Sequence, residues 1–412
     1  MHIKVGFNKV RNLILVVIFA VGIFAGGYYL GVKGYQLQIT KALQISINQA
    51  TPPDVNANMD LFWTVWKDLS DKYYDKSKLV PSQMVDGAIE GMVSALGDPY
   101  TMYLPASENK IVNDNLSGSF EGVGIEIGIK DSKLVVIAPL TGSPAEAAGV
   151  KAGDYITHIT DTQKGLDVDT TGLGIDEAVT DIKGPAGTKV SLTLMRGTDP
   201  KPIVAEITRA KINVPSVSLS WVGSGSDIAD IKISEFGAET TDEWSKTVTQ
   251  VLQKGDAKGI IIDLRNNPGG YMQSAVDIAS DFISSGTTVV IQQDGDGTKT
   301  STPSEDLHQR LMNYKVVVLI NGGSASASEI LSGALRDDRG IKLVGDKSFG
   351  KGTIQDPEDI PGGAGLHITI AKWLTPDGTW VHGKGLTPDV AVANSDNSTV
   401  DDQLNAAIKL FQ

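Results

Sequence analysis

The sequence predicts a mixed α/β protein, and the stretch between Val316 and Gly345 gives the main reason. Val316–Ile320 is a short apolar run rich in β-branched residues, which is typical of a buried strand. A glycine-containing break follows, and apolar residues then recur at helical spacing over Ala327–Leu335. A second strand pattern covers Ile341–Gly345. Two strands joined by a helix in this order are expected to be parallel, with a right-handed crossover.

A β-rich stretch upstream predicts a separate small domain within residues 116–210, ahead of an α/β core assigned to residues 211–412. Val123–Ile129 and Leu134–Ala138 flank a polar turn, which predicts a β-hairpin. A helix is predicted at Ile175–Ile182, and a Gly-Pro turn then leads into another strand. The small domain is therefore expected to be inserted between the N-terminal region and the core.

Within the core, further strands are predicted at Ile228–Ile233 and Gly259–Leu264, on either side of a helix at about Glu239–Gln253. An Asn-Pro-Gly-Gly turn follows, and a helical stretch then runs to Ile283. The chain closes with a short amphipathic helix at Asp401–Phe411. This alternation of strands and helices is typical of an α/β core.

The first 34 residues are expected to anchor the chain in a membrane. An uncharged run of 21 residues, 12–32, follows a cationic flank that includes Lys9 and Arg11. A helix of that length spans ~30 Å of hydrocarbon. The cationic end is expected to stay in the cytoplasm, which places the rest of the chain outside the cell. A cleaved signal peptide is the alternative, but its apolar core is usually ~7–15 residues and ends at an Ala-x-Ala-like site.

Residues 35–58 are expected to form a stalk with at most a short helical piece, and residues 59–115 a helical region. Apolar side chains at helical spacing predict one amphipathic helix from Asp60 to Tyr73 and a second over Met84–Leu96. Such stripes are usually packing surfaces. They are expected either to cover the core or to pair with a second copy of the chain, which would give a homodimer.

Composition excludes several classes of function. The chain has 412 residues and a net charge of −13, which argues against nucleic acid as its partner. It has no cysteine, which excludes a cysteine nucleophile, thiolate metal ligands and disulfides. No metal site or cofactor is expected, because no metal-ligand spacing relates the five histidines, which are His2, His158, His308, His367 and His382.

Three polar residues of the core have the properties of a nucleophilic site. Ser326 falls where a strand ends and a helix begins, beside free backbone N–H groups and the positive end of the helix dipole. Lys351 lies between two glycines that allow close approach of the backbone. Lowering a lysine pKa from ~10.4 to about 7 in an apolar pocket costs about 5 kcal/mol. Gln355 is placed to hold the amine by a hydrogen bond. Either motif alone is also compatible with an ordinary surface loop.

Together, the motifs G-S-A-S-A-S-E and F-G-K-G-T-x-Q resemble those of the C-terminal processing peptidases, also called tail-specific proteases. The resemblance covers roughly Asp60 to Phe411 and implies an α/β core of the crotonase-like or protease-like type. It implies that Ser326 is the nucleophile, Lys351 the general base and Gln355 the residue that positions the base. This is a Ser/Lys dyad, a serine-protease arrangement without histidine.

The same resemblance implies an oxyanion hole made of backbone N–H groups. One donor would be Ala327, next to the nucleophile. The other would come from the Asn-Pro-Gly-Gly turn, at either Gly269 or Gly270. Glu329 lies on the serine helix and is expected to support the site rather than to act as a catalytic carboxylate.

The inserted domain resembles a PDZ domain through S-P-A-E-x-A-G-V-x-x-G-D at residues 143–154. PDZ domains bind a peptide as an added strand and hold its terminal carboxylate on backbone N–H groups. The matching loop has glycines that let these groups converge on an anion, and it consists of Gly122, Val123, Gly124 and Ile125. Lys183 is a departure, because the family commonly has arginine at this position.

The expected function is that of a membrane-anchored serine endopeptidase that processes exported proteins at or near their C-termini. Its expected partners are protein substrates with exposed, apolar C-terminal residues. A catalytically silent PDZ adaptor at the cell envelope is the first alternative. An acyl-CoA-type enzyme with a crotonase-like fold is the second, although no feature of the sequence indicates a nucleotide site.

Overall fold

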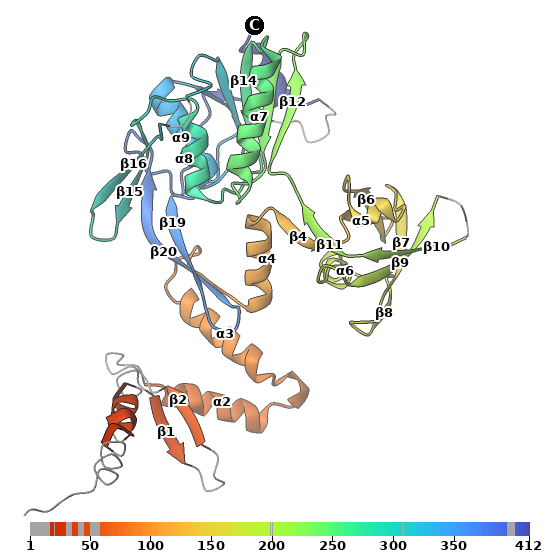
Figure 1. Cartoon of the computed structure of the whole chain (residues 1–412), viewed down its shortest axis with the longest axis vertical. Coiled ribbons are helices and arrows are strands. Elements are labelled where there is room, and N and C mark those ends of the chain that lie inside the picture. The colour runs from red at the N-terminus through yellow and green to blue at the C-terminus, as the bar shows by residue number, and fades with distance from the viewer. Residues whose placement is uncertain are drawn as a thin grey trace, which may run out of the picture. The chain divides into compact units, whose positions relative to one another are not determined.

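The computed structural model describes residues 17–19, 21–29, 35–39, 45–49, 58–197, 199, 201–306, 309–393 and 400–412 (Figure 1). The chain forms two compact units, residues 1–84 and residues 85–412. All candidate site residues lie in the second unit.

In the first unit, residues 17–19 and 21–29 are helical. The rest of the predicted membrane span, residues 12–16, 20 and 30–32, lies outside the described residues. Among the residues described, no helix combines the length and the apolar character needed to cross a membrane.

A strand pair occupies the segment expected to be a stalk. β1 (Tyr35–Ile39) pairs antiparallel with β2 (Ile45–Gln49). The short helical piece considered for this segment was therefore wrong. Apolar and polar residues alternate in YQLQI and in ISIN, and this period of two favours a strand over a helix.

The predicted helix after Asp60 is confirmed as α2 (Asp60–Lys72), followed by the short helix η1 (Lys76–Lys78). No residue of α2 is buried, although its side chains include an edge-to-face pair of aromatic rings, Phe62 and Trp63, with centroids 4.9 Å apart. The second predicted helix is confirmed as α3 (Pro81–Ser94), which starts at a proline, a residue well suited to the first helical turn.

The second unit begins at Val85, within α3, and continues with β3 (Met102–Leu104) and α4 (Ala106–Leu116). The chain then enters the inserted domain through β4 (Ser119–Gly122). The chain leaves that domain through β11 (Ala210–Asn213), which pairs antiparallel with β4. The entry and exit strands are thus hydrogen-bonded to each other, as expected for a domain inserted into another.

The inserted domain is an antiparallel sheet in the order β10-β9-β7-β6-β5, with β8 added to β7. The predicted hairpin and the predicted helix are confirmed as β5–β6 and α6. The elements are β5 (Ile125–Lys130), β6 (Lys133–Pro139), α5 (Pro144–Ala147), β7 (Asp154–Asp161), β8 (Leu166–Asp169), α6 (Ile175–Ile182), β9 (Lys189–Arg196) and β10 (Ile203–Thr208). Arg209 closes the domain with a buried ion pair, donating to Asp161 at 2.7 Å.

The core is built on a sheet in the order β12-β13-β14-β17-β18-β21, in which only β12 is antiparallel to its neighbour. The parallel pairing of β17 and β18 around a connecting helix confirms the prediction for that stretch. The strands are β12 (Val217–Val222), β13 (Ile228–Ile233), β14 (Gly259–Asp263), β17 (Val316–Ile320), β18 (Lys342–Gly345) and β21 (Val390–Ala391).

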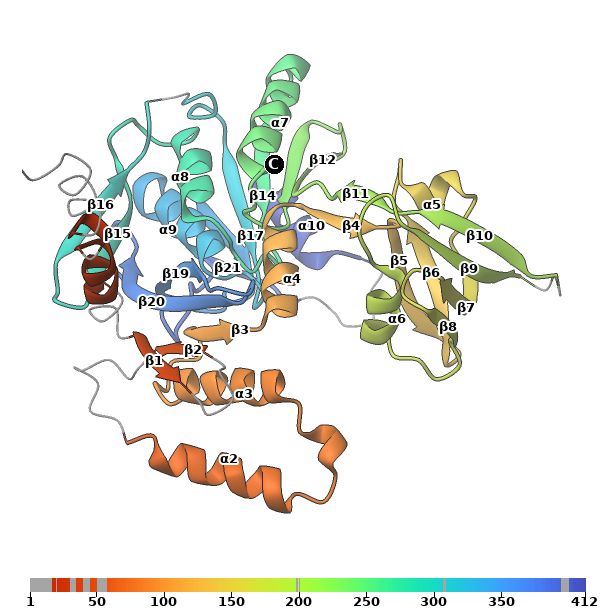
Figure 2. The same cartoon turned by 60° about the horizontal axis from the view of Figure 1, so that its bottom comes forward.

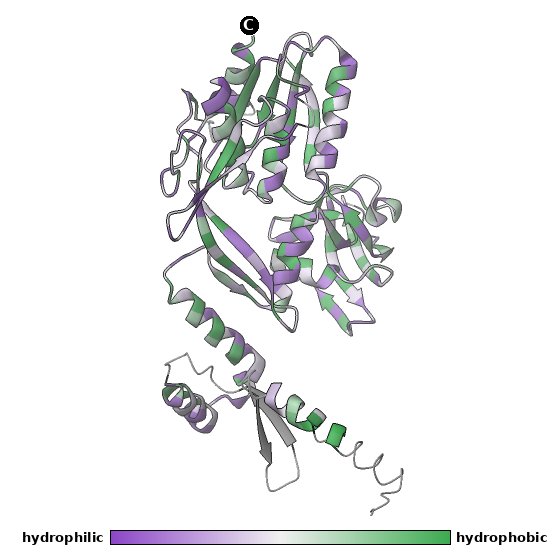
Figure 3. Ribbon diagram, turned by 60° about the vertical axis from the view of Figure 1, so that its left-hand side comes forward, coloured by the Kyte–Doolittle hydropathy of each residue, from purple (hydrophilic) through white to green (hydrophobic). Residues whose placement is uncertain are grey.

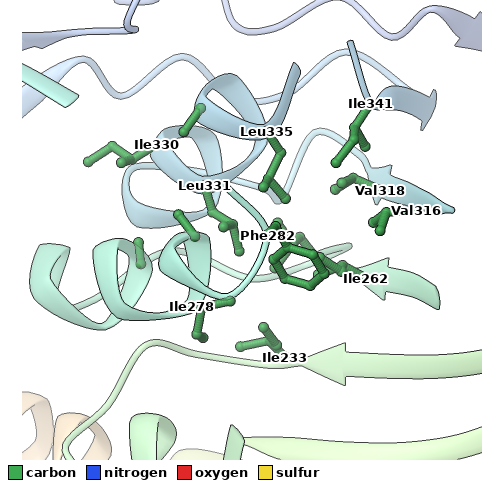
Figure 4. Packing of buried hydrophobic residues seen from close by; sticks show 14 of the residues in the cluster. Ile233, Ile262, Ile278, Phe282, Val316, Val318, Ile330, Leu331, Leu335 and Ile341 are labelled. Atoms are coloured by element: carbon green, nitrogen blue, oxygen red, sulfur yellow. The ribbon is translucent and has the colours of Figure 1, made fainter. Parts of the chain in front are cut away.

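Helices cover this sheet, and apolar residues are concentrated along the core strands (Figure 3). α8 and α9 lie side by side (Figure 2). Figure 4 shows Phe282, just after α8, beside Leu331 of α9 and Ile262 of β14, all three fully buried. The helices are α7 (Thr240–Lys254), α8 (Met272–Ser280), α9 (Ala327–Arg339) and, against the other face of the sheet, α10 (Asp402–Lys409).

A second, antiparallel sheet lies beside the first in the order β16-β15-β20-β19. Its strands are β15 (Thr288–Asp294), β16 (Lys299–Pro303), β19 (Thr353–Asp359) and β20 (Gly365–Leu374). β3, from the N-terminal side of the inserted domain, pairs with β20 of this sheet. A segment more than 260 residues upstream of β20 is thereby fixed beside the region that carries Lys351.

Candidate active site

The predicted site residues gather at one edge of the parallel sheet. β14, β17 and β18 are parallel neighbours, so their carboxyl ends share an edge. The Asn-Pro-Gly-Gly turn follows β14, Ser326 follows β17 and Lys351 follows β18. Crevices at the carboxyl ends of parallel strands are the usual position of binding sites in open α/β sheets.

Ser326 has an unusual backbone conformation, with φ 54° and ψ −115°. A positive φ is uncommon for a residue other than glycine, and such strain is concentrated at functional sites. Ser326 directly precedes α9, which confirms its predicted position between strand and helix. The N–H of Ala327, the first residue of α9, donates to no described residue, as expected at a helix N-terminus.

One buried carboxylate joins the loops that carry Ser326 and Lys351. Glu329 is 1% exposed, and its Oε2 accepts hydrogen bonds from the backbone N–H of Ser326 at 3.0 Å and of Lys351 at 2.9 Å. Its Oε1 accepts from the Gly350 N–H at 2.8 Å and the Ser348 hydroxyl at 2.5 Å. Burial raises the pKa of Glu329, and these four hydrogen bonds act in the opposite direction.

The expected supporting role of Glu329 is thus seen as a direct link between the two loops. The Ser-x-x-Glu spacing of a helix N-terminus is the sequence signal for half of this link, because a glutamate at that position reaches back to the backbone N–H before the helix. The other half, from Glu329 to the Lys351 loop, joins residues 22 positions apart and has no such local signal.

Lys351 extends its amine toward an aromatic ring, with Nζ 5.3 Å from the ring centroid of Tyr100. Burial lowers the pKa of Lys351 from its ordinary value, and the charge of Asp98 acts in the opposite direction. The predicted direction of the shift is therefore confirmed. The predicted close approach is confirmed at Gly350, where φ is +92° and a Cβ atom would lie 2.7 Å from the N atom of Gly385.

Gln355 does not hold the lysine amine in this structure. Its Nε2 donates to the hydroxyls of Thr353 at 2.8 Å and Thr369 at 3.2 Å. No hydrogen bond joins Gln355 to Lys351 in the described parts of the chain. The reason is strand register, because Gln355 of β19 lies opposite Thr369 of β20, next to a β-bulge. A catalytic role for Gln355 stays a prediction.

The Asn-Pro-Gly-Gly turn lies directly against the serine. A Cβ atom on Gly269 would come within 2.8 Å of Ser326 Cβ and 3.1 Å of Ala327 N. The N–H of Gly269 donates to Asn267 Oδ1 at 2.9 Å, whereas the N–H of Gly270 donates to no described residue. Of the two glycines, Gly270 is thus the one whose amide is available to another acceptor.

The second half of this turn is fixed by the segment after β13. Phe236 N–H donates to the Gly269 carbonyl at 2.8 Å, and Tyr271 N–H donates to the Phe236 carbonyl at 2.7 Å. These two bonds bracket Gly270 and hold its peptide plane in one orientation. The Gly270 N–H lies opposite the Gly269 carbonyl in the same trans peptide group, so it points away from the Phe236 N–H that binds this carbonyl.

The predicted carboxylate loop of the inserted domain borders a cavity of about 360 Å³. Val123, Gly124 and Ile125 line this cavity, and Gly122 lies in β4, opposite Ala210. The N–H groups of Val123 and Gly124 donate to no described residue. Other lining residues come from α6 and the core, and include Val179, Ile182, Lys183, Glu235 and Gly237.

Among the described residues, no group of three or more histidine, aspartate or glutamate side chains is arranged to hold a metal ion. His2 and His308 lie outside them. The ring of His382 stacks on Trp380 with centroids 5.0 Å apart.

Three family models match parts of this chain. Residues 227–392 match the family described as peptidase family S41, residues 111–195 match the PDZ domain, and residues 20–107 match the N-terminal domain of the activating protease CtpB. The carboxy-terminal processing protease CtpB of Bacillus subtilis is 34% identical over 376 residues, which cover 91% of this chain and 76% of the relative. The chain belongs to the carboxy-terminal processing proteases of peptidase family S41.

Other members of the family are longer or more distant. A probable CtpA-like serine protease of Staphylococcus aureus is 39% identical over 336 residues, which cover 82% of this chain but only 65% of the relative. This chain thus spans less than two thirds of the length of the staphylococcal relatives. A solved structure of a putative S41 protease from Bacteroides fragilis aligns with a TM-score of 0.52 over 87% of this chain and 98% of that one. At 14% identity, that similarity concerns the fold alone.

Proposed function

We propose that this protein is a serine endopeptidase that cleaves protein substrates at or near their C-termini. The observation that carries the proposal is the Glu329 carboxylate, which accepts hydrogen bonds from the backbone of both Ser326 and Lys351. A shared acceptor at these two positions fixes the relative placement of a nucleophile and its base, which geometry-dependent catalysis requires. Membership in the family of carboxy-terminal processing proteases supports the same assignment.

In the proposed mechanism, neutral Lys351 takes the proton from Ser326 Oγ, and Ser326 attacks the scissile carbonyl carbon. The N–H groups of Ala327 and Gly270 stabilise the oxyanion of the tetrahedral intermediate. Lys351 then gives the proton to the leaving amine, and an acyl-enzyme ester remains. Lys351 next deprotonates a water molecule, which hydrolyses the ester and frees Ser326. Burial supports the neutral form of the lysine, because it lowers the pKa of Lys351.

The proposed substrate is a protein whose apolar C-terminal residue enters the cavity of the PDZ domain. The free N–H groups of Val123 and Gly124 would donate hydrogen bonds to the terminal carboxylate. Val179 and Ile182 line the same cavity and offer an apolar surface to the last side chain. Lys183 lines it too and adds positive charge near the carboxylate.

Anchoring in a cell membrane by residues 1–34, with the N-terminus in the cytoplasm and the catalytic part outside, is part of the proposal. Its support is the uncharged run of residues 12–32 behind a cationic flank. Extraction of membranes at alkaline pH tests it. Retention of the full-length chain in the membrane is expected, and release into the supernatant would contradict the anchor.

A homodimer formed through the N-terminal helices is proposed from the open apolar face of α2, where Val65 is 50% exposed and Leu69, one turn on, is 41% exposed. Sedimentation of the full-length protein in detergent should give the mass of a dimer. A monomeric mass over the accessible concentration range would contradict it.

The activity is tested by incubating an unstructured protein with an apolar C-terminus with the full-length chain and with Ser326→Ala. Ser301→Ala, at an exposed serine of β16, is the matched control. Intact-mass spectrometry should show fragments cut near the C-terminus with the wild type and the control only. Cleavage by Ser326→Ala would contradict the nucleophile. Binding of the substrate without cleavage by the wild type would favour the adaptor function.

A further inference from the structure

A segment that precedes the PDZ domain, residues 98–104, lies beside the side chain of Lys351. β3 pairs with β20, and just ahead of it the hydroxyl of Thr101 accepts a hydrogen bond from Thr369 N–H at 3.0 Å. Thr101 is 8% exposed. Its hydroxyl in turn donates to Asp98 Oδ2 at 2.7 Å, and Tyr100 N–H donates to Asp98 Oδ1 at 3.0 Å. These bonds fix the Asp98 side chain with respect to the core.

The same segment forms one wall of the lysine pocket. The Tyr100 ring centroid lies 5.3 Å from Lys351 Nζ, a distance within the range of cation–π contacts. Asp98 is the charged group whose field acts on Lys351 in the direction opposite to burial. The segment is also connected to Gln355, the residue that the family motif predicts to position the lysine. Gln355 donates a hydrogen bond to the hydroxyl of Thr369, and the N–H of Thr369 donates to the hydroxyl of Thr101.

We propose that Asp98 is a positioning residue of the lysine base, and that its carboxylate stabilises the ammonium group that Lys351 becomes on accepting the proton of Ser326. This inference rests on the proposed serine peptidase activity. It adds to the Ser/Lys dyad a negative charge that comes from the N-terminal side of the PDZ domain.

The charge balance of the proton transfer explains why such a group is needed. When the proton moves from Ser326 Oγ to Lys351 Nζ, a positive charge appears in a largely buried place, which desolvation penalises. The carboxylate of Glu329 already accepts four hydrogen bonds, and all four donors belong to the two loops that it joins. Asp98 accepts from Tyr100 N–H, the Thr101 hydroxyl and the Thr369 side chain, and its charge favours the ammonium form of Lys351.

Other titratable groups also face this pocket. Burial lowers the pKa of His367, and the charge of Lys351 acts in the same direction. His382 contacts Tyr100 edge to face, with ring centroids 5.7 Å apart. These groups and Glu329 are present in every variant considered below, so differences between the variants report on Asp98.

The test measures how fast a small fluorophosphonate acylates Ser326 of the full-length protein, as a function of pH. This reagent needs the nucleophile and its base but no tail-binding domain. Removal of the Asp98 charge by Asp98→Asn leaves desolvation unopposed, so the ammonium form loses stability. We expect the apparent pKa of the labelling profile to fall by about one unit and the plateau rate to fall about tenfold.

Two variants serve as controls. Asp86→Asn removes a carboxylate of the same N-terminal region that accepts a hydrogen bond from Tyr103 at 2.8 Å, and it should label like the wild type. Asp98→Glu keeps the charge and should restore the wild-type pKa. Because the apparent pKa depends on the shape of the profile and not on the amount of folded protein, a partly unfolded variant still reports it.

The outcomes separate this inference from the proposed function. A wild type that labels at Ser326, with an Asp98→Asn profile unchanged in pKa, would overturn the role of Asp98 alone. An equal shift in Asp86→Asn would also overturn it. A wild type that does not label at Ser326 at any pH would overturn the peptidase function, and this inference with it.

Discussion

Two glycine-containing loops of this chain are suited to bind an anion, and they differ in the space that their amides face. In the core, Gly269 and Gly270 have φ values of +106° and +131°, and a Cβ atom on Gly270 would lie 2.2 Å from the Phe236 carbonyl oxygen. In the PDZ domain, Gly124 has a φ of +75° and borders a cavity of about 360 Å³. Each loop has N–H groups that donate to no described residue.

The difference between the loops matches two different tasks. A closed turn beside the serine can hold one oxygen atom at a fixed distance, as the stabilisation of a tetrahedral intermediate requires. An open loop on a cavity can hold a carboxylate while the rest of a C-terminal residue fills the space behind it. Changes in the core turn should therefore alter the rate of the chemical step, and changes in the PDZ loop should alter affinity for the tail.

The largest effect is expected from Gly269→Ala. The new Cβ atom would lie 2.8 Å from Ser326 Cβ, so the turn must shift and Gly270 N–H must move with it. We expect kcat to fall by about 10³, the size of effect seen when an oxyanion donor is lost, with tail-peptide affinity unchanged. Gly286→Ala is the matched control, because Gly286 has a φ of +77° and no heavy atom within 4 Å of the added Cβ. A normal kcat in Gly269→Ala would contradict the closed turn.

A smaller effect on the same loop system is expected from Glu329→Gln. The side-chain NH₂ group of the glutamine cannot accept hydrogen bonds. Backbone N–H groups that now donate to a carboxylate oxygen of Glu329 would therefore lose their acceptor. We expect kcat to fall about 10²-fold through misplacement of Ser326 relative to Lys351. Glu243→Gln is the control, because Glu243 also accepts from several donors, among them Ser216 N–H at 2.7 Å, but lies outside the site. Equal losses of kcat in both variants would show that Glu329 contributes only to the stability of the fold.

Sequence patterns predicted the parts of this molecule that are local. The strands at Val316–Ile320 and Ile341–Gly345 and the helix between them follow from short-range periodicity, and Ser326 takes its position from that unit. Family motifs, rather than periodicity, singled out Gly269, and the structure indeed brings it against Ser326.

Contacts set by long-range register could not be predicted in this way. Gln355 was expected to reach the lysine four residues before it, but a β-bulge in the β19–β20 pair turns it toward Thr369. The proximity of Tyr100 to Lys351 depends on the pairing of β3 with β20, across the whole inserted domain. In the stalk, by contrast, the alternation in YQLQI is a local signal that favours a strand over a helix.

The smallest effect, and the one that separates the two loops most directly, is expected from Gly124→Ala. Its Cβ atom would lie 2.4 Å from Ser143 Cβ, which displaces the loop while leaving the core turn untouched. Loss of one hydrogen bond to a charged carboxylate removes about 1.5–3 kcal/mol, so affinity for an apolar tail peptide should fall at least about tenfold. Labelling of Ser326 by a fluorophosphonate should not change. Gly165→Ala controls for backbone strain, because Gly165 has a φ of +66° in the same domain and open space around it. If Gly124→Ala instead slows labelling while it leaves tail affinity intact, the two loops do not divide binding and chemistry between them.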